Sequence, residues 1–325
     1  MKKILCLIPL LLMTLTGCGI SNSENVKKLK LGHALTETHP VHLAMVKFAE
    51  LTKERTDGSI EVIIFPNGQL GGEREITELM QAGAIDLIKT NAAPLEPFAS
   101  EYAVLSLPFL FRDMEHHLKT LKSEVGEEIL NLTEDRGFIG LTFYNSGTRN
   151  FYANKPIYTP ADLEGMIIRV QPSKIPVKMM ELLGGSATPL SFGEIYTALQ
   201  QKVVDGAENN LISYADSKHS EVAKCFTFDE HSMVPDILLI NTNTWNKLTP
   251  EEQKIVKSAA IESFDYQNTL WDEMEQKQIE ILKNQGVKFY NVEKKPFQDK
   301  VRPMYEEAMK NDRMKYFIEK IQAVK

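Results

Sequence analysis

Cysteine is scarce in this sequence: the 325 residues include three, Cys6, Cys18 and Cys225. The first two fall within or directly after an N-terminal leader, so Cys225 has no partner in the rest of the chain. The folded part is therefore expected to contain no disulfide and to draw its stability from a large core. Basic residues are also a minority, with 37 Lys and Arg against 44 Asp and Glu and a net charge of −7. A surface of this sign repels phosphate backbones, which argues against nucleic acid as a partner.

Motifs of common enzyme classes are absent as well. The sequence contains no G-x-S-x-G, H-E-x-x-H or G-x-G-x-x-G pattern and no Walker loop. His33, His39 and His42 lie close together in sequence, a pattern that suggests zinc, but no ligating carboxylate accompanies them at metal spacing. We therefore predict no metal site, no cofactor and no catalytic residue. His39 is expected instead to serve the entrance of a helix.

Long apolar runs are few. A mean hydropathy of −0.24 and a charged fraction of 25% leave no room for several membrane spans. Without the first 17 residues, 308 of the 325 remain, about twice the size of a ~150-residue domain. The expected body is water-soluble and consists of two ordinary domains or one large fold.

The main apolar run lies at the N-terminus, over residues 4–15 after two lysines. It is too short to span a bilayer as a helix and is typical of a secretory signal. Residues 15–18 read LTGC, which resembles the lipobox of bacterial lipoproteins. We expect residues 1–17 to form the signal peptide, Cys18 to be lipidated, and residues 18–28 to form a polar tether at the outer face of a membrane. The alternative is an ordinary signal peptide with an incidental cysteine.

Strands and helices alternate in the first part of the remaining chain. We expect strands at 29–35, 59–65 and 85–90, with helices from 40 to about 57 and from about 73 to 84 between them. Such alternation predicts an α/β sheet. A second group of strands begins near Gly140, which places the boundary between two lobes near 145–147. The group comprises 141–144, 148–153 and 166–170.

The longest expected element is a helix over 250–285. Thr249 and Glu252 form a capping box, with Pro250 at the first helical position. The following 35 residues contain no Gly or Pro, and a helix of that length measures about 50 Å, longer than the ~40 Å breadth of one lobe. It is therefore expected to lie across both lobes; the alternative is a break near Asp265 into two helices. The predicted lobe I is 29–146 plus about 235–265, and lobe II is 147–234 plus about 275–325.

Arg169 is the sharpest candidate for a binding residue. It lies in the apolar strand 166–170, directly before a turn and helix. In open α/β sheets ligands bind at the C-terminal ends of strands, where a guanidinium can hold a carboxylate through two hydrogen bonds. An internal salt bridge is the alternative role. Arg149, just past the lobe boundary, could face the same cleft as a second cation, although alone it would be read as a surface arginine.

A further polar segment follows a helix expected to begin at Ser191. The short strand after it ends in Glu208 and Asn209. The amide of Asn209 suits a hydroxyl or carboxylate oxygen, although an asparagine that stabilises a turn is the commoner role.

The chain from Leu29 into the long helix resembles the DctP-type extracytoplasmic solute-binding proteins of TRAP transporters. The resemblance rests on residues 66–71 (PNGQLG), 107–111 (LPFLF), 168–170 (IRV) and the block 188–209. It implies an α/β, two-lobe fold of the periplasmic-binding-protein kind, with a cleft that closes on ligand and a long helix spanning both lobes. It also implies a TRAP permease as membrane partner and no enzymatic activity.

The resemblance further implies which residues bind ligand. In that family the arginine matching Arg169 clamps the ligand carboxylate, supported by the residues matching Arg149 and Asn209. The aromatic at the position of Phe192 lines the pocket, and Glu73 falls at a position that contacts ligand hydroxyls. Four further polar residues fall at strand or loop positions bordering the family cleft: His33, Lys89, Asn91 and Asp236.

Departures from the family pattern narrow the ligand. Lys202 replaces a helix-ending Gly and Asn210 replaces a common Pro, both of which concern loop geometry. Sialic-acid binders hold Asn and Glu at the positions of Ala34 and Asn91, so sialate is disfavoured. Two arginines together with several hydroxyl-binding groups favour a polyhydroxylated monocarboxylate, such as glucuronate or galacturonate, over a bare dicarboxylate.

Two other functions stay open at this point. The first is a cell-surface carbohydrate hydrolase that uses paired carboxylates such as Glu73 and Glu208. The second is a receptor that presents its ligand-bound form to a sensor kinase.

Overall fold

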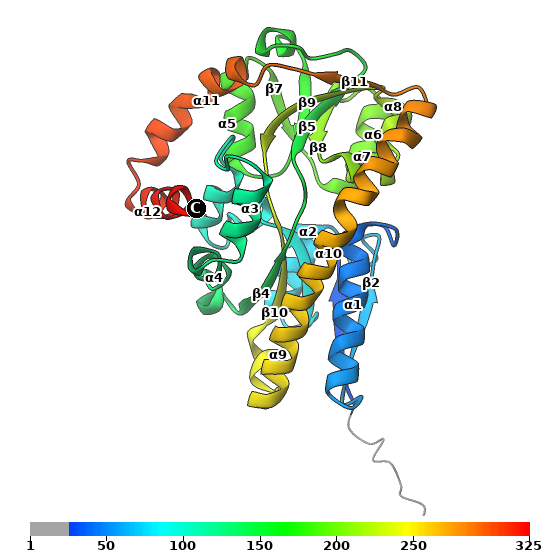
Figure 1. The fold of residues 1–325 in the computed structure, drawn as a ribbon, viewed down its shortest axis with the longest axis vertical. Helices are drawn as coiled ribbons and strands as arrows, with labels where there is room; N and C mark the ends of the chain where they lie inside the picture. The colour runs from blue at the N-terminus through cyan, green and yellow to red at the C-terminus, as the bar shows by residue number, and fades with distance from the viewer. Residues whose placement is uncertain (1–25) are drawn as a thin grey trace, which may run out of the picture.

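Two mixed β-sheets organise the chain in the computed structural model, which describes residues 26–325 (Figure 1). The first sheet, which defines lobe I, has five strands in the order β2-β1-β3-β10-β4. Strand β1 runs parallel to β2 and β3, and β10 runs antiparallel to β3 and β4. The bounds of these strands are β1 Lys27–Gly32, β2 Ile60–Phe65, β3 Leu87–Asn91, β4 Phe138–Tyr144 and β10 Asp236–Asn241.

The second sheet, which defines lobe II, has six strands in the order β11-β9-β5-β8-β6-β7. Strand β5 runs antiparallel to β8 and β9, while β6 runs parallel to β7 and β8. The bounds are β5 Arg149–Ala153, β6 Ile167–Val170, β7 Ser186–Pro189, β8 Gly206–Asn209, β9 Cys225–Ser232 and β11 Lys288–Asn291.

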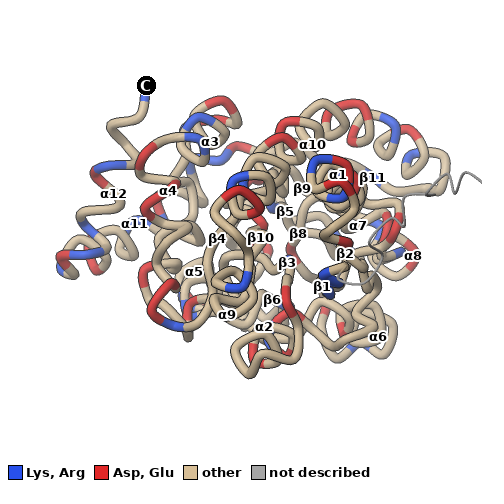
Figure 2. The backbone as a smooth tube through the Cα atoms, turned by 90° about the horizontal axis from the view of Figure 1, so that it is seen from below, with Lys and Arg blue, Asp and Glu red and all other residues tan. Residues whose placement is uncertain are grey.

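Helices cover the outer faces of both sheets, and Figure 2 shows acidic and basic residues interspersed along outer helices such as α10, α11 and α12. The α-helices are α1 Pro40–Arg55, α2 Glu73–Gln81, α3 Met114–Leu121, α4 Glu124–Leu130, α5 Lys174–Leu183, α6 Ile195–Gln200, α7 Leu211–Asp216, α8 His219–Val222, α9 Thr242–Asn246, α10 Pro250–Asn284, α11 Lys295–Ala308 and α12 Asp312–Ala323. The 3₁₀ segments are η1 Ala93–Leu95, η2 Ser100–Ser106, η3 Glu134–Arg136, η4 Pro160–Leu163 and η5 Phe192–Glu194.

The alternation expected from the sequence is present, and the α/β, two-lobe fold class is confirmed. The boundary of the first strand differs, because β1 begins at Lys27 and ends at Gly32. All six of its residues pair with β2, so the last two residues of the predicted tether belong to the sheet. Backbone pairing continues past the apolar residues that mark a strand in sequence, and this shifts the boundary.

Helix α10 is continuous, so the alternative break near Asp265 is absent. Its N-terminus carries the predicted capping box: the Glu252 N–H donates to the Thr249 hydroxyl over 3.2 Å, and the Thr249 N–H donates to the Glu252 carboxylate over 2.7 Å. The helix packs on α1 and β4 of lobe I and farther along on α7 of lobe II. The prediction of a lobe-spanning helix is confirmed (Figure 1).

The connection from β4 to β5 passes between the lobes beside α10. Gly147 in this connection has φ +62°, and a Cβ built on it would lie 2.7 Å from the Trp271 ring of α10. Only glycine combines this left-handed backbone with so close an approach to an aromatic side chain. The β4–β5 connection is therefore packed tightly on α10 at this point.

The C-terminal helix α12 does not pack where the sequence suggested. Residues 275–325 are predicted to belong to lobe II, and α11 does pack on α5 and β9 of that lobe. Helix α12, however, packs on α4 and η2 of lobe I, and Arg112 of lobe I donates to the backbone carbonyls of Gln322 and Val324. The three buried residues of α12 form an apolar face that fits either lobe by pattern alone, so only the tertiary structure places it.

No helix within residues 26–325 is long and apolar enough to cross a membrane. The predicted signal peptide, and Cys18 with most of the tether, lie outside the described residues.

Candidate ligand-binding site

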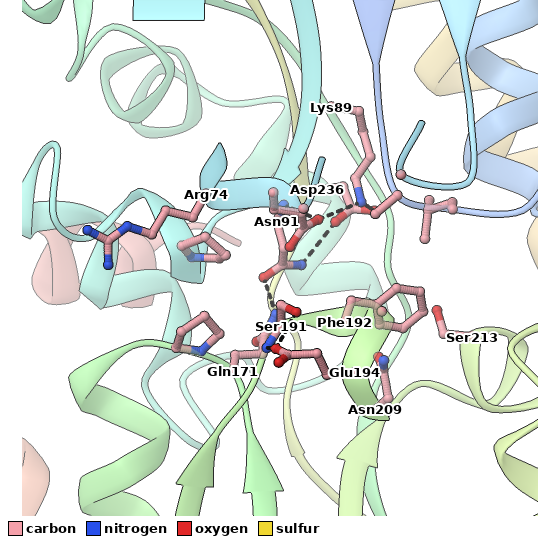
Figure 3. A pocket seen from close by; sticks show the side chains of 18 of the residues that line it. Arg74, Lys89, Asn91, Gln171, Ser191, Phe192, Glu194, Asn209, Ser213 and Asp236 are labelled. Carbon is pink, nitrogen blue, oxygen red and sulfur yellow. Dashed lines mark hydrogen bonds and ion pairs between the residues drawn. The ribbon is translucent and has the colours of Figure 1, made fainter. Parts of the chain in front are cut away.

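A cavity of about 650 Å³ lies between the two lobes and receives side chains from both (Figure 3). Loops and strand ends of β1, β3 and β10 with the start of α2 form its lobe I side, and the ends of β6 and β8 with the loop before α6 form its lobe II side. The lining residues are Ala34, Leu35, Asn67, Gly68, Gly71, Gly72, Glu73, Arg74, Glu75, Lys89, Asn91, Pro94, Ser146, Arg149, Arg169, Gln171, Pro172, Ser191, Phe192, Gly193, Glu194, Asn209, Asn210, Ser213 and Asp236.

The structure brings eight of the nine predicted ligand-binding residues to this cavity. They are Arg169, Arg149, Asn209, Glu73, Asn91, Lys89, Phe192 and Asp236. The ninth, His33, is buried and is not among the lining residues.

His33 supports the turn after β1. Its Nδ1 accepts the Leu35 backbone N–H over 3.1 Å, so in the neutral ring Nε2 carries the proton and donates to His42 Nδ1 at 3.0 Å. Burial and the nearby Lys89 ammonium lower the pKa of His33 to about 2. His39 caps α1 through Nδ1, as predicted. Within the described residues, no cluster of His, Cys, Asp and Glu is arranged to hold a metal.

Lobe II contributes an arginine wall, which we define as Arg149, Arg169 and Asn209. The register of β5 on β8 pairs Asn150 with Asn209, so Arg149 lies beside the end of β8. Its Nε donates to the Glu208 carboxylate, its Nη2 to the Glu208 backbone carbonyl at 2.9 Å and its Nη1 to Asn209 Oδ1 at 3.1 Å. Since Asn209 Oδ1 is occupied in this way, its side-chain NH₂ is the group left to donate toward the cavity.

Arg169 lies on the neighbouring strand β6, paired with residue 207 of β8. Its Nε and Nη2 donate to the Leu190 carbonyl at 2.9 and 2.7 Å, which orients the guanidinium plane. Its Nη1 has no hydrogen-bond partner among the described residues and lies 3.9 Å from Glu208 Oε1. A guanidinium has five N–H groups, so three remain for a ligand or for Glu208.

Three further side chains behind the arginine wall set its charge. His231 lies between Asp229 at 2.7 Å and Glu208 at 3.6 Å. Burial opposes protonation, but these two carboxylates raise the pKa of His231 to about 9. Burial would also raise the pKa of Glu208, but Arg149 and His231 lower it to about 2. The cluster of Arg149, Arg169, His231, Glu208 and Asp229 thus contains three basic and two acidic side chains, which leaves an excess of one positive charge at the arginine wall.

Lobe I contributes a carboxylate wall, which we define as Glu73, Lys89 and Asp236. The Lys89 ammonium lies 3.1 Å from Glu73 Oε1 and 3.1 Å from Asp236 Oδ2. The side chains of Lys89 and Asp236 are 2% and 4% exposed, so these charges interact through a medium of low dielectric. Burial by itself would lower the pKa of Lys89, but the two carboxylates outweigh burial and raise this pKa. Burial and Glu73 raise the pKa of Asp236.

A hydrogen-bonded chain crosses the cavity from one lobe to the other. Gln171, just after β6, donates from Nε2 to Asn91 Oδ1 at 3.0 Å, and Asn91 Nδ2 donates to Asp236 Oδ1 at 3.0 Å. Figure 3 shows Gln171 reaching toward Asn91 and Asp236. Beside this chain, Ser173 and the Lys174 backbone N–H both donate to the Glu96 carboxylate of lobe I. The two lobes are therefore in direct contact across the cavity.

The loop before α6 contributes the aromatic part of the site. Phe192 begins η5, and its ring lies edge-on to His219 with centroids 6.0 Å apart. The turn is held by Glu194, which accepts the backbone N–H of Ser191 at 2.9 Å. The two residues that depart from the family sequence pattern fit their positions: Lys202 adopts a left-handed φ of +57°, and Asn210 caps α7.

Several site residues are missing from the sequence prediction. Gln171 lies two positions after Arg169. In an extended chain this spacing places both side chains on the same side, so it could have predicted that Gln171 faces the cavity. From the sequence, Glu208 is expected at the end of a strand and is a candidate catalytic carboxylate. The structure places it behind Arg149, ionised and away from the residues that line the cavity, so it forms no hydrolytic pair with Glu73. His231 has a local partner in Asp229, two residues earlier on β9, but nothing local links it to the site, because its second partner Glu208 lies on another strand.

Comparison with known proteins places the chain in a family. The model of the DctP family, described as bacterial extracellular solute-binding protein, family 7, matches residues 31–312. The protein YiiZ of Salmonella typhimurium is 41% identical over 308 residues, covering 94% of this chain and 93% of YiiZ.

Two solved structures are similar over almost the whole chain. A TRAP periplasmic solute-binding protein of Xanthobacter autotrophicus with bound β-D-galacturonate is 39% identical, with a TM-score of 0.89 over 91% of this chain and 100% of that one. A TRAP periplasmic solute-binding protein of Roseobacter denitrificans with bound β-D-glucuronate is 36% identical, with a TM-score of 0.89 over 92% and 100%. Both are solute-binding proteins, and the prediction that the chain is not an enzyme is confirmed. The chain belongs to the DctP family of bacterial extracellular solute-binding proteins.

Proposed function

We propose that this protein captures a hexuronate, D-glucuronate or D-galacturonate, outside the cytoplasm and delivers it to a TRAP permease. The observation that carries the proposal is the opposition of two unlike walls across one cavity. The arginine wall has an excess of positive charge for a carboxylate, and the other wall offers groups that bind hydroxyls. The hexuronates bound by the two similar solved proteins support the same assignment.

The carboxylate end of the ligand is assigned to Arg169. A carboxylate that enters the cavity loses its hydration, and this loss is tolerable only where a positioned cation replaces the water. The Leu190 carbonyl holds one edge of the Arg169 guanidinium, which leaves N–H groups of both Nη atoms to form two parallel bonds. Arg149 and the Asn209 amide supply further donors beside it.

The hydroxyl end is assigned to the carboxylate wall and Asn91. The Glu73 and Asp236 carboxylates accept from ligand hydroxyls, and the Lys89 ammonium retains one N–H beyond the two directed at those carboxylates. Phe192 provides an apolar surface at the side of the cavity. A sugar acid with one carboxylate and several hydroxyls satisfies both ends.

The proposal is tested by thermal unfolding and calorimetry. Ligand at 100 times its Kd stabilises the native state by about 2.7 kcal/mol, which raises the Tm by several degrees. We expect this shift with D-glucuronate or D-galacturonate and no shift with D-glucose or D-galactose. A shift with succinate or pyruvate, and with no hydroxylated acid, would contradict the hexuronate assignment.

We also propose that the mature chain is anchored to the membrane through diacylglycerol on Cys18. The support is the LTGC sequence at residues 15–18 after a lysine-led apolar run. In detergent phase separation, the wild type should enter the detergent phase and Cys18→Ala should not. Equal partitioning of the two into the aqueous phase would refute the anchor.

A further inference from the structure

The carboxylate wall carries an unusual charge balance for a site that faces an anionic ligand. Two carboxylates, Glu73 and Asp236, share the single ammonium of Lys89. Glu73 Oε1 also accepts the Asn91 backbone N–H at 3.0 Å, and Glu73 lies in the first turn of α2, where the helix dipole favours an acidic side chain. The wall therefore has two acidic side chains for one basic side chain, the reverse of the balance at the arginine wall.

The remaining hydrogen-bond capacity of this wall suits a hydroxyl. Among the described residues, no hydrogen bond reaches the second oxygen of Glu73, which can only accept. Lys89 has one N–H left beside it. A hydroxyl both donates and accepts and satisfies the two groups together, whereas a carboxylate has no proton for Glu73 and brings a second negative charge.

We propose that Glu73 and Asp236, bridged by Lys89, exclude a second carboxylate from the cavity, so that the protein accepts uronates and rejects the corresponding aldarates. The inference rests on the proposed function, since it assumes that the uronate carboxylate occupies the arginine wall. D-galacturonate and galactarate are a sharp pair for it. They share the carbon chain and the configuration of its hydroxyls, but C1 is a neutral hemiacetal or aldehyde carbon in galacturonate and a carboxylate in galactarate. Since galactarate also cannot close into a pyranose ring, the change of the affinity ratio in the variants below isolates the effect of charge.

Because the carboxylate wall is little exposed to solvent, we expect a large difference in affinity between uronates and aldarates. Lys89 and Asp236 are almost fully buried, and Glu73 is 14% exposed. Like charges brought together in such surroundings cost several kcal/mol. We therefore expect the wild type to bind galacturonate about 100-fold more tightly than galactarate, with the same order for glucuronate against glucarate.

The test is calorimetry with both ligands on the wild type, Glu73→Gln and Glu78→Gln. Glu73→Gln removes the free carboxylate oxygen and should narrow the uronate-to-aldarate ratio by about tenfold or more. Glu78→Gln is the matched control, because Glu78 lies on the same helix, is exposed and is paired with Arg74. It should leave the ratio unchanged. Asp236→Asn provides a second variant in case Glu73→Gln does not fold.

The outcomes separate this inference from the proposed function. If the wild type binds galacturonate and galactarate within threefold of each other, or if both folded variants keep the wild-type ratio, the exclusion is overturned while hexuronate binding stands. If the wild type binds neither galacturonate nor glucuronate, or binds only their aldarates, both are overturned.

Discussion

Basic and acidic side chains occur in opposite proportions at the arginine wall and at the carboxylate wall. On lobe II, three cations surround two carboxylates, whereas on lobe I two carboxylates surround one ammonium. Apart from Glu73, which is 14% exposed, the charged side chains of both clusters are buried, so their interactions are weakly screened. The comparison teaches that an ion pair in a binding cavity need not be neutral. The charge left over after pairing is the part that a ligand must match.

The largest effect is expected when the ammonium is removed from the carboxylate wall. Lys89→Met leaves two buried carboxylates without a counter-charge, and we expect it to lower the free energy of unfolding by about 3–5 kcal/mol. Denaturant unfolding of the ligand-free protein measures the loss. Adding Asp236→Asn to Lys89→Met should restore part of it.

A surface lysine provides the control for that prediction. Lys53 pairs with Glu61, and its side chain is 58% exposed, so Lys53→Met should change the free energy of unfolding by less than about 1 kcal/mol. If Lys89→Met is as mild as Lys53→Met, the buried ion pairs of the carboxylate wall contribute little to stability.

The second test acts on the arginine wall through binding. Arg169→Lys keeps the charge and loses the planar fork, and we expect hexuronate affinity to fall by about 2–4 kcal/mol, or about 30- to 1000-fold. Arg169→Ala should lose at least as much. Calorimetry on variants with a wild-type circular dichroism spectrum is the measurement.

Arg74→Lys is the matched control, because Arg74 borders the same cavity but is 72% exposed. It should bind within threefold of the wild type. If Arg169→Lys also binds within threefold, Arg169 does not make the clamp, and Arg149 becomes the better candidate.

The third test concerns the charge behind the arginine wall. The pKa of His231 is raised from 6.5 to about 9 in the folded protein. The folded state therefore holds the proton more tightly, and the added stability is complete below pH 6.5 and is lost as the pH rises through 9. Over that range the wild type should lose on the order of 2 kcal/mol that His231→Gln does not lose. Denaturant unfolding between pH 6 and 9.5 measures both, and parallel profiles would show that His231 is not protonated at neutral pH.

The smallest expected effect comes from the chain that joins the two walls. Gln171→Leu removes the donor to Asn91 across the cavity, at a cost of about 1 kcal/mol or about fivefold in affinity. Because the bond holds the lobes together, the change should appear as faster ligand dissociation with little change in association. An unaltered dissociation rate in stopped-flow experiments would mean that the bond plays no part in retaining the ligand.

The ion pairs and hydrogen bonds between distant segments, and the placement of helices on the lobes, could not be predicted from local sequence patterns. Arg149 and Glu208 are 59 positions apart and Asn91 and Asp236 are 145 apart, and they meet only because strands β5 and β8, and β3 and β10, pair in a particular register. A shift of one residue in either register would turn these side chains to the other face of the sheet. His33 directly precedes two residues that line the cavity, Ala34 and Leu35, but its own ring is turned toward His42.

Features that depend on a few neighbouring residues could be predicted from the sequence alone. The cap at Thr249 and the absence of Gly and Pro after it specify α10, and the position of Arg169 in a short apolar strand before a turn places it at a strand end. The positions of Glu208 and His231 behind the arginine wall, and the packing of α12 on lobe I, are visible only in the tertiary structure. The reason is that helix caps and apolar periods act within one or two turns of chain, whereas buried charges are set by whichever partners the sheet register brings within about 4 Å.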